Sequence, residues 1–167
     1  MRNLFVALLS TLLFVKGHAQ IPDEDKAEIM KAVHSLFTAM ETNDGTLATR
    51  VFYENAQLHT ISTDDKGTVM LHVTPVAALI RAIGQPRESS WSEPIWNEKI
   101  ESDGMLASVW ATYAFFVGNM FHHCGSDAFH LIKTDQGWKI FHLTDTRQTD
   151  GCVVPEEVMA RYHESLR

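Results

Sequence analysis

The chain has 167 residues, of which 45% are hydrophobic and 21% charged, a balance typical of one globular domain with an apolar core rather than of a disordered or fibrous protein. Its formal net charge is −7, and without residues 1–19 it is −9, because 12 basic residues then face 21 acidic ones. No Lys or Arg run offsets that charge, so the sequence excludes nucleic acid and anionic membranes as partners.

The first residues have the pattern of a secretory signal peptide. Arg2 precedes an apolar run from Leu4 to Val15, and small residues lead up to Ala19. This run is shorter than the ~20 apolar residues that span a bilayer, which argues against an uncleaved anchor. We therefore expect cleavage after Ala19 and a single domain over residues 20–167, in a periplasmic or secreted protein.

Helical patterns dominate the first half of that domain. Residues 21–44 place apolar side chains at helical spacing, with acidic residues in the first turn and a polar stop at the end. Residues 45–53 predict a short second helix, and residues 76–83 predict a third, with Pro before it and Gly after it. Two strands are expected between them, over residues 56–62 and 67–73.

Long strand patterns follow from Trp91 onward. The expected strands cover residues 91–101, 105–117, 120–134 and 138–149, and a hairpin signal separates each from the next. From Pro155 the tail predicts one or two helical turns or a frayed end. Helices followed by an antiparallel meander imply an α+β fold, in which the helices cover one face of a bent sheet and the concave face forms a pocket.

Turn chemistry gives a register for the last two hairpins. A type I turn with a glycine bulge at residues 135–137 pairs Thr134 with Trp138, which sets Asp127 opposite Asp145. His123 and Arg147 share their face because side chains alternate along a strand. This face is apolar toward the turn and polar at its far end, as in a ligand pocket. With a two-residue turn at Gly118-Asn119 in the preceding hairpin, the residues predicted to bind a ligand are Trp110, Thr112, Phe116, Phe129 and Phe141.

Asp127, Asp145, His123 and Arg147 are the candidate catalytic residues. Two aspartates directly opposite each other, with β carbons roughly 5 Å apart, cannot both ionise cheaply, so one becomes a general acid or base while the other stays charged. His123 or Arg147 would then stabilise negative charge on a substrate during isomerisation, dehydration or water addition. The alternative is that Arg147 bridges both aspartates in a structural or ligand-orienting network without chemistry.

The cysteines and the remaining histidines carry weaker signals. Cys124 and Cys152 are compatible with a disulfide in an oxidising compartment and equally with two independent thiols. His130 is expected opposite His142 on the other face of the hairpin, without a third ligand, so we predict no metal site. His59 reaches the pocket if the first strand lines it. No phosphate loop, serine elbow or nucleotide fingerprint is present, so no cofactor is expected.

The stretch "FHHCGSDAFHLIKTDQGWKIFHLTDTR", preceded by "SVWATYAFF", resembles the nuclear transport factor 2-like superfamily, and within it the secreted bacterial proteins labelled SnoaL-like or lumazine-binding. The resemblance is specific over residues 104–152 and looser over residues 23–103. It implies a cone-shaped α+β fold, in which a strongly curved antiparallel sheet wraps around a long N-terminal helix, encloses a pocket and commonly forms a dimer through its outer face.

The same resemblance leaves the activity open. The superfamily includes ketosteroid isomerases, scytalone dehydratase, limonene epoxide hydrolases and polyketide cyclases beside many binding domains, and a fold does not determine a function. Its enzymes tend to use an aspartate with histidine, tyrosine or arginine inside the cone, which by position implies Asp127, Asp145, Arg147 and His123.

Three functions remain in view. The leading expectation is an exported homodimer that binds a small apolar-to-amphipathic molecule, whose polar group is oriented by the Asp/Arg/His cluster. The first alternative is an isomerase, dehydratase or hydrolase that uses Asp127 or Asp145 as general acid or base. The second alternative is a protein-interaction module that uses the outer sheet face.

Overall fold

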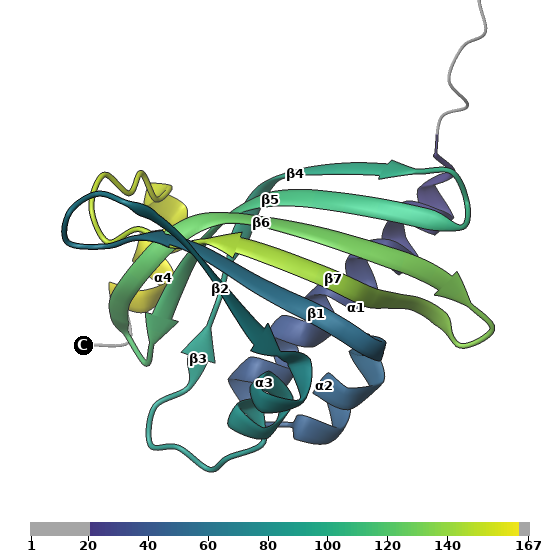
Figure 1. Ribbon diagram of the computed structural model, residues 1–167, viewed down its shortest axis with the longest axis horizontal. Coiled ribbons are helices and arrows are strands. Elements are labelled where there is room, and N and C mark those ends of the chain that lie inside the picture. Colours follow the sequence, from purple (N-terminus) through teal and green to yellow (C-terminus); the bar gives the residue numbers. More distant parts are fainter. Residues whose placement is uncertain (1–20, 164–167) are drawn as a thin grey trace, which may run out of the picture.

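A curved sheet arches over three helices in the computed structural model, which describes residues 21–163 (Figure 1). The helices are α1 (Asp23–Thr42), α2 (Gly45–Val51) and α3 (Val76–Ile83), and a fourth, α4 (Glu156–His163), lies at the opposite end of the sheet. The predicted signal peptide lies outside the described residues. No helix within the described range is long and apolar enough to cross a membrane.

The three helices form where the apolar periodicity predicted them. Helix α1 buries Ile29, Val33 and Leu36 against the sheet and ends at Asn43, which adopts a left-handed conformation with φ 55°. The Asp44 side chain then accepts a hydrogen bond of 2.8 Å from the backbone N–H of Leu47 and caps α2. Helix α2 is shorter than predicted, because the chain is already extended from Phe52 onward.

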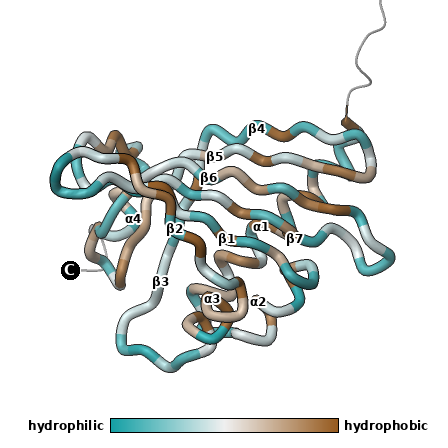
Figure 2. Tube along the Cα trace, in the orientation of Figure 1, coloured by the Kyte–Doolittle hydropathy of each residue, from teal (hydrophilic) through white to brown (hydrophobic). Residues whose placement is uncertain are grey.

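Seven strands make one mixed sheet. They are β1 (Phe52–Thr63), β2 (Val69–Pro75), β3 (Trp91–Ser92), β4 (Ile95–Ser102), β5 (Leu106–Val117), β6 (Met120–Thr134) and β7 (Gly137–Thr146). Their order is β2-β1-β7-β6-β5-β3, with β4 also paired to β5. Strands β4 to β7 form the predicted antiparallel meander, whereas β1 runs parallel to β7. The predicted α+β fold class is confirmed. Hydrophilic residues occur in the turns at the ends of the hairpins (Figure 2).

The register between β6 and β7 is confirmed at the site but not at the turn. Asp127 pairs with Asp145, as the sequence predicted. At the turn, however, Thr134 pairs with Gly137 rather than Trp138, and a bulge beyond His130 restores the predicted pairing. Trp138, which the predicted pairing places on the face of His130 and His142, therefore faces the core instead.

The predicted register between β5 and β6 is correct at the turn and wrong beyond it. Phe116 pairs with Phe121 as predicted, but a bulge at His122 shifts all later pairs by one residue. Asp127 therefore pairs with Ala111, and Trp110 pairs with Ala128. Because a shift of one residue turns side chains to the opposite face, Trp110 faces outward.

These pairings define two rows of side chains across the sheet. The inner row runs over five strands, with directly paired residues Ala111, Asp127, Asp145, Thr60 and His72. The outer row, one residue along, consists of Trp110, Ala128, Thr144, His59 and Val73. The inner row faces the helices and carries the polar groups of the candidate site.

Candidate functional site

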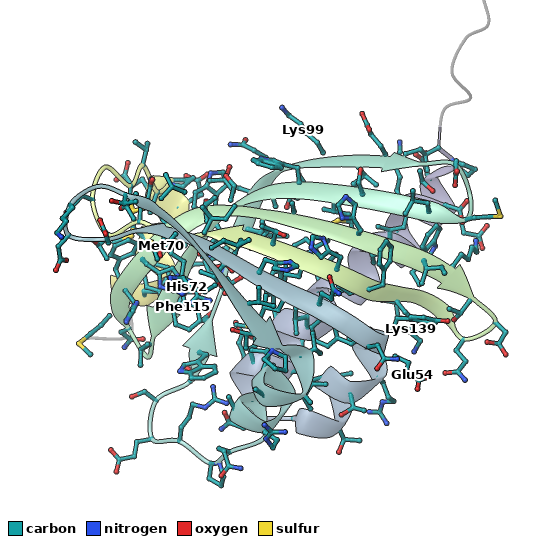
Figure 3. The ribbon with its side chains drawn as sticks, viewed as in Figure 1. Glu54, Met70, His72, Lys99, Phe115 and Lys139 are labelled. Carbon is teal, nitrogen blue, oxygen red and sulfur yellow. A yellow bond between two sulfur atoms is a disulfide. The ribbon has the colours of Figure 1, made fainter. Side chains whose placement is uncertain are left out.

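A cavity of about 640 Å³ lies between the concave face of the sheet and the helices. Most of its wall is apolar, and His72 and Phe115, labelled in Figure 3, line it from β2 and β5. Among its apolar residues are Leu36, Leu58, Leu79, Trp91, Phe115 and Leu143. Its polar end brings together Thr60, Glu93, His123, Asp127, Asp145 and Arg147.

Asp145 is a fully partnered carboxylate at this polar end. It accepts hydrogen bonds of 2.6 Å from the Thr60 hydroxyl and 2.6 Å from Nε of Arg147, and a longer one of 3.3 Å from the Tyr113 hydroxyl. Burial and the nearby carboxylates raise the pKa of Tyr113, which keeps this hydroxyl protonated as a donor. The charge of Asp145 is therefore balanced by Arg147 and supported by two hydroxyl groups.

Asp127 lies in a different environment, although it is paired directly with Asp145. Its side chain is 1% exposed, and its Oδ2 atom has no hydrogen-bond donor among the described residues. The carboxyl of Glu93 lies close enough to interact electrostatically with that of Asp127. Two neighbouring carboxyls removed from water repel each other when both are charged, which favours the state in which at least one of them carries a proton.

The pKa values of this carboxyl pair reflect burial first and charge second. Burial, followed by the negative charge of Asp145, raises the pKa of Glu93 to about 8. Burial, followed by the charges of Glu93 and Asp145, raises the pKa of Asp127 well above its ordinary value. Arg147 opposes both shifts but is already bonded to Asp145. The polar end thus holds one carboxyl paired with Arg147 beside two carboxyls whose pKa values are raised.

Glu93 is the residue that sequence reasoning missed. It lies between β3 and β4 and precedes Pro94, whose carbonyl accepts a bond of 3.2 Å from the backbone of Ala114 and keeps this segment beside β5. The sequence prediction treated residues 91–101 as one strand and assigned Glu93 no role. A usable signal was its spacing of two from Trp91, which places both side chains on one face of the sheet edge.

His123 is a neutral ring rather than a cation. It stacks on Phe115 with ring centroids 4.9 Å apart, and its Nδ1 lies 2.8 Å from Nδ1 of His122. Burial, reinforced by the positive charge of Arg147, lowers the pKa of His123 to about 4. At neutral pH it can accept or donate a hydrogen bond but carries no charge for stabilising an anion.

The structure thus brings all four predicted catalytic residues into one cavity, whereas none of the five predicted ligand-binding residues lines it. Trp110 is 50% exposed on the outer face, beside Thr112, because of the bulge at His122. Phe116 is covered by α4, with its ring 3.8 Å from that of Tyr162. Phe129 packs on Phe37 in the core, and Phe141 stacks on His130 on the outer face.

The cysteines form a bridge and the outer histidines form a chain. Cys124 and Cys152 are joined by a disulfide that ties β6 to the segment before α4.

His59 points outward, away from the cavity, and its Nδ1 lies 2.8 Å from Nε2 of His142, which in turn approaches His130 at 3.1 Å. Within the part of the chain that the structure describes, no group of three or more His, Cys, Asp or Glu could hold a metal ion.

Solved structures resemble this chain, whereas no protein-family model and no curated protein match it. A protein of unknown function with a cystatin-like fold from Nostoc punctiforme has a TM-score of 0.61 and 11% identity, and the match covers 78% of this chain and 96% of that one. A variant of a protein of unknown function from Mycobacterium tuberculosis has a TM-score of 0.60 and 18% identity, with 87% and 94% covered. A nuclear transport factor 2-like protein of unknown function from Shewanella baltica has a TM-score of 0.56 and 16% identity, with 78% and 99% covered.

At such low identities these matches show the fold and leave the activity open. Further matching structures, from Novosphingobium aromaticivorans and Silicibacter pomeroyi, are also nuclear transport factor 2-like proteins. The chain therefore has the nuclear transport factor 2-like, or cystatin-like, fold.

Proposed function

We propose that the protein binds a small, partly apolar molecule in the cavity and holds its polar group at the carboxyl end. The observation that carries this proposal is the unpartnered Oδ2 atom of Asp127 at the buried end of an apolar cavity. An unpaired polar atom in such a place costs folding free energy of about 1–3 kcal/mol, which a bound ligand would recover. The cavity volume lies within the range of small-molecule sites.

We further propose that the protein acts outside the cytoplasm, in the periplasm or as a secreted protein, and that it belongs with the SnoaL-like group. The disulfide between Cys124 and Cys152 supports export because such bonds persist in oxidising compartments. The leader pattern of residues 1–19 supports it independently. Detection of mature protein beginning at Gln20 in a periplasmic or culture fraction would test this location.

Cavity filling tests the binding proposal. Ala78 of α3 lines the cavity, so Ala78→Phe should abolish the binding of fragments that ligand-observed NMR detects with the wild-type protein. The matched control is Ala77→Phe, one position along the same helix, where the side chain is exposed and does not line this cavity. If no fragment binds the wild-type protein, or if the two variants bind equally well, the proposal is wrong.

Acid–base catalysis is the second candidate, and the proton shared by Glu93 and Asp127 favours it. A protonated carboxyl beside the ionised Asp145 is the arrangement that isomerases, dehydratases and hydrolases use to donate and accept protons. Since Asp145 is already bonded to Arg147, Asp127 is the better acid or base of the two aspartates, and Glu93 helps to set the pKa of Asp127.

This candidate is tested with any compound that the protein is found to turn over. Asp127→Asn should then lower kcat by about 10²–10⁴-fold, as loss of a general acid or base does. Glu93→Gln should shift the pH profile of kcat/KM. Unchanged turnover in Asp127→Asn would eliminate this mechanism, while the binding proposal would stand.

A further inference from the structure

We infer that the molecule bound in this cavity carries a basic amine on an apolar body, with its ammonium group placed between Glu93 and the unpartnered oxygen of Asp127. This inference deepens the proposed binding function and rests on it. It assigns a chemical class to the ligand from the charges, the hydrogen-bond donors and the walls of the cavity.

The charges at the polar end are unbalanced. Three carboxyls, those of Glu93, Asp127 and Asp145, line the cavity together with a single guanidinium, that of Arg147. Nε of Arg147 lies 2.6 Å from Asp145, so that cation is already paired. The remaining two carboxyls have no cationic partner among the described residues, and burial raises the pKa of both. A ligand ammonium would supply the missing positive charge.

The other titratable groups around this end do not supply that charge. His123 of β6 is neutral because burial lowers its pKa to about 4. Tyr113 of β5 stays protonated and gives its hydroxyl hydrogen to Thr146 and Asp145. His72 of β2 and His122 of β6 also face the cavity, but neither forms a salt bridge with Glu93 or Asp127. The carboxyl pair therefore remains available to a ligand.

The hydrogen-bonding needs of the pair point to the same group. Oδ2 of Asp127 lacks a donor among the described residues, and the Asp127 side chain lines the cavity. A primary ammonium brings up to three N–H donors and no acceptor, which suits two acceptor carboxylates. A ligand carboxylate would bring only acceptors and a repelling charge, and a ketone would bring no donor.

The rest of the cavity selects an apolar body beside the amine. Leu58, Leu79 and Leu143 line it from three different elements, and Trp91 and Phe115 stand edge to face with centroids 6.0 Å apart. A volume of about 640 Å³ accommodates a ring with a short aminoalkyl arm. The molecule would thus be an amphiphilic amine whose apolar part is buried as its charge is paired.

Amine binding must then be linked to proton release. The free amine is already charged, so placing it between Glu93 and Asp127 drives the site to lose a proton to solvent. Affinity should rise with pH below the pKa of the displaced proton, by up to about tenfold per pH unit. A neutral ligand of the same shape displaces no proton and should show no such dependence.

The test compares three probes of similar size: 2-phenylethylamine, 2-phenylethanol and 3-phenylpropanoate. Titration calorimetry of the protein at pH 6 and pH 8, in two buffers of different ionisation enthalpy, reports both affinity and protons released. We expect the amine to bind at least about tenfold more tightly than the alcohol at pH 8, since charge-assisted hydrogen bonds are the stronger ones. We also expect the amine alone to gain affinity between pH 6 and pH 8, with proton release, and the carboxylate to be excluded.

Two variants and a control locate the effect. Glu93→Gln and Asp127→Asn should each weaken binding of the amine by more than they weaken binding of the alcohol, and should each reduce the pH dependence of amine binding. Glu98→Gln, which removes an exposed carboxyl of β4, should behave as the wild type, and thermal melts show whether each variant is folded.

Two outcomes overturn the inference. Equal or tighter binding of the alcohol, or amine binding without a pH dependence, would contradict the amine while leaving the cavity as a site for neutral molecules. Failure of all three probes also contradicts it, and the fragment screen with Ala78→Phe then decides separately whether the cavity binds small molecules.

Discussion

Glu93, Asp127 and Asp145 are three neighbouring carboxyls with different protonation, and their partners explain the difference. Asp145 receives hydrogen bonds from a hydroxyl of β1 and from Arg147, which compensate its negative charge. Asp127 and Glu93 have mainly each other, so burial keeps a proton between them. Residue type alone did not distinguish these environments; the number of donors that the fold brings to each carboxyl did.

Replacing Glu93 should reveal this proton as a pH-dependent stability. The pKa of Glu93 is raised from 4.5 to about 8 in the folded protein, so its contribution to stability is complete below pH 4.5 and is lost as the pH rises through 8. Glu93→Gln cannot ionise, so it should match the wild type at pH 5 and exceed its unfolding free energy by about 1–3 kcal/mol at pH 8.5.

Urea denaturation at the two pH values measures this difference. Glu98→Gln is the exposed control and should follow the wild type at both. Parallel pH profiles for Glu93→Gln and the wild type would show that Glu93 is not held protonated by the fold.

At the scale of elements, single bulges decide which side chains line the cavity. The bulge at His122 turns Phe115 inward and Trp110 outward, and the bulge after His130 turns Trp138 into the core. Turn chemistry placed both turns at the right residues, although Thr134 pairs with Gly137 rather than with Trp138. It did not reveal the bulges, because a bulge forms where it improves burial of both strands, which depends on α1 and the neighbouring strands.

The C-terminal segment is the element most dependent on a covalent link. The disulfide between Cys124 and Cys152 closes a loop of 28 residues. Beyond it, Tyr162 of α4 packs on Phe116, and the Tyr162 hydroxyl lies 2.6 Å from the Ser92 hydroxyl. Replacing both cysteines with alanine should lower the unfolding free energy by about 3–4 kcal/mol through the entropy of that loop.

Urea denaturation of the double variant, compared with wild type in the presence and absence of a reductant, provides the measurement. The reductant should destabilise the wild type and leave the double variant unchanged. Equal stability of reduced and oxidised wild type would mean that packing of α4 alone holds the segment.

At the scale of the molecule, the sheet has one face covered by helices and one largely uncovered. The outer face carries the exposed Leu71, at 60%, on the edge strand β2, and Trp110, at 50%, on β5. Between them lies the chain of His59, His142 and His130, in which burial and the neighbouring rings lower the pKa of His142. Such an apolar and weakly charged face favours burial against a second copy.

We therefore predict a homodimer that is weakened by charge on this face. Leu71→Glu combined with Trp110→Glu should convert the dimer to a monomer in light scattering coupled to gel filtration, because two desolvated carboxylates oppose association. Met105→Glu, at a more exposed site in the turn between β4 and β5, is the control. A wild-type protein that is monomeric at all concentrations, or a monomer produced only by Met105→Glu, would contradict this assignment.

The amino-acid sequence by itself determined the helices, the hairpin ends, the α+β class and the direct opposition of Asp127 and Asp145. The helices, hairpin ends and fold class follow from apolar periodicity and turn residues, which act over a few neighbouring positions. The opposition of the two aspartates was predicted correctly although the pairing at the turn was not, because the bulge beyond His130 compensates for that difference. His123 and Arg147 were found for the same reason, since alternation along a strand places them with the aspartates.

Only the tertiary structure decided which other residues lie beside the two aspartates, His123 and Arg147. Thr60 reaches the aspartates from β1, and Glu93 reaches them from the segment between β3 and β4, both far away in sequence. Trp110 faces away from them because of a bulge that no local sequence pattern predicts. The protonation of the pair was equally beyond local reasoning, because it depends on how completely the assembled cavity excludes water and on which carboxyl receives the single guanidinium.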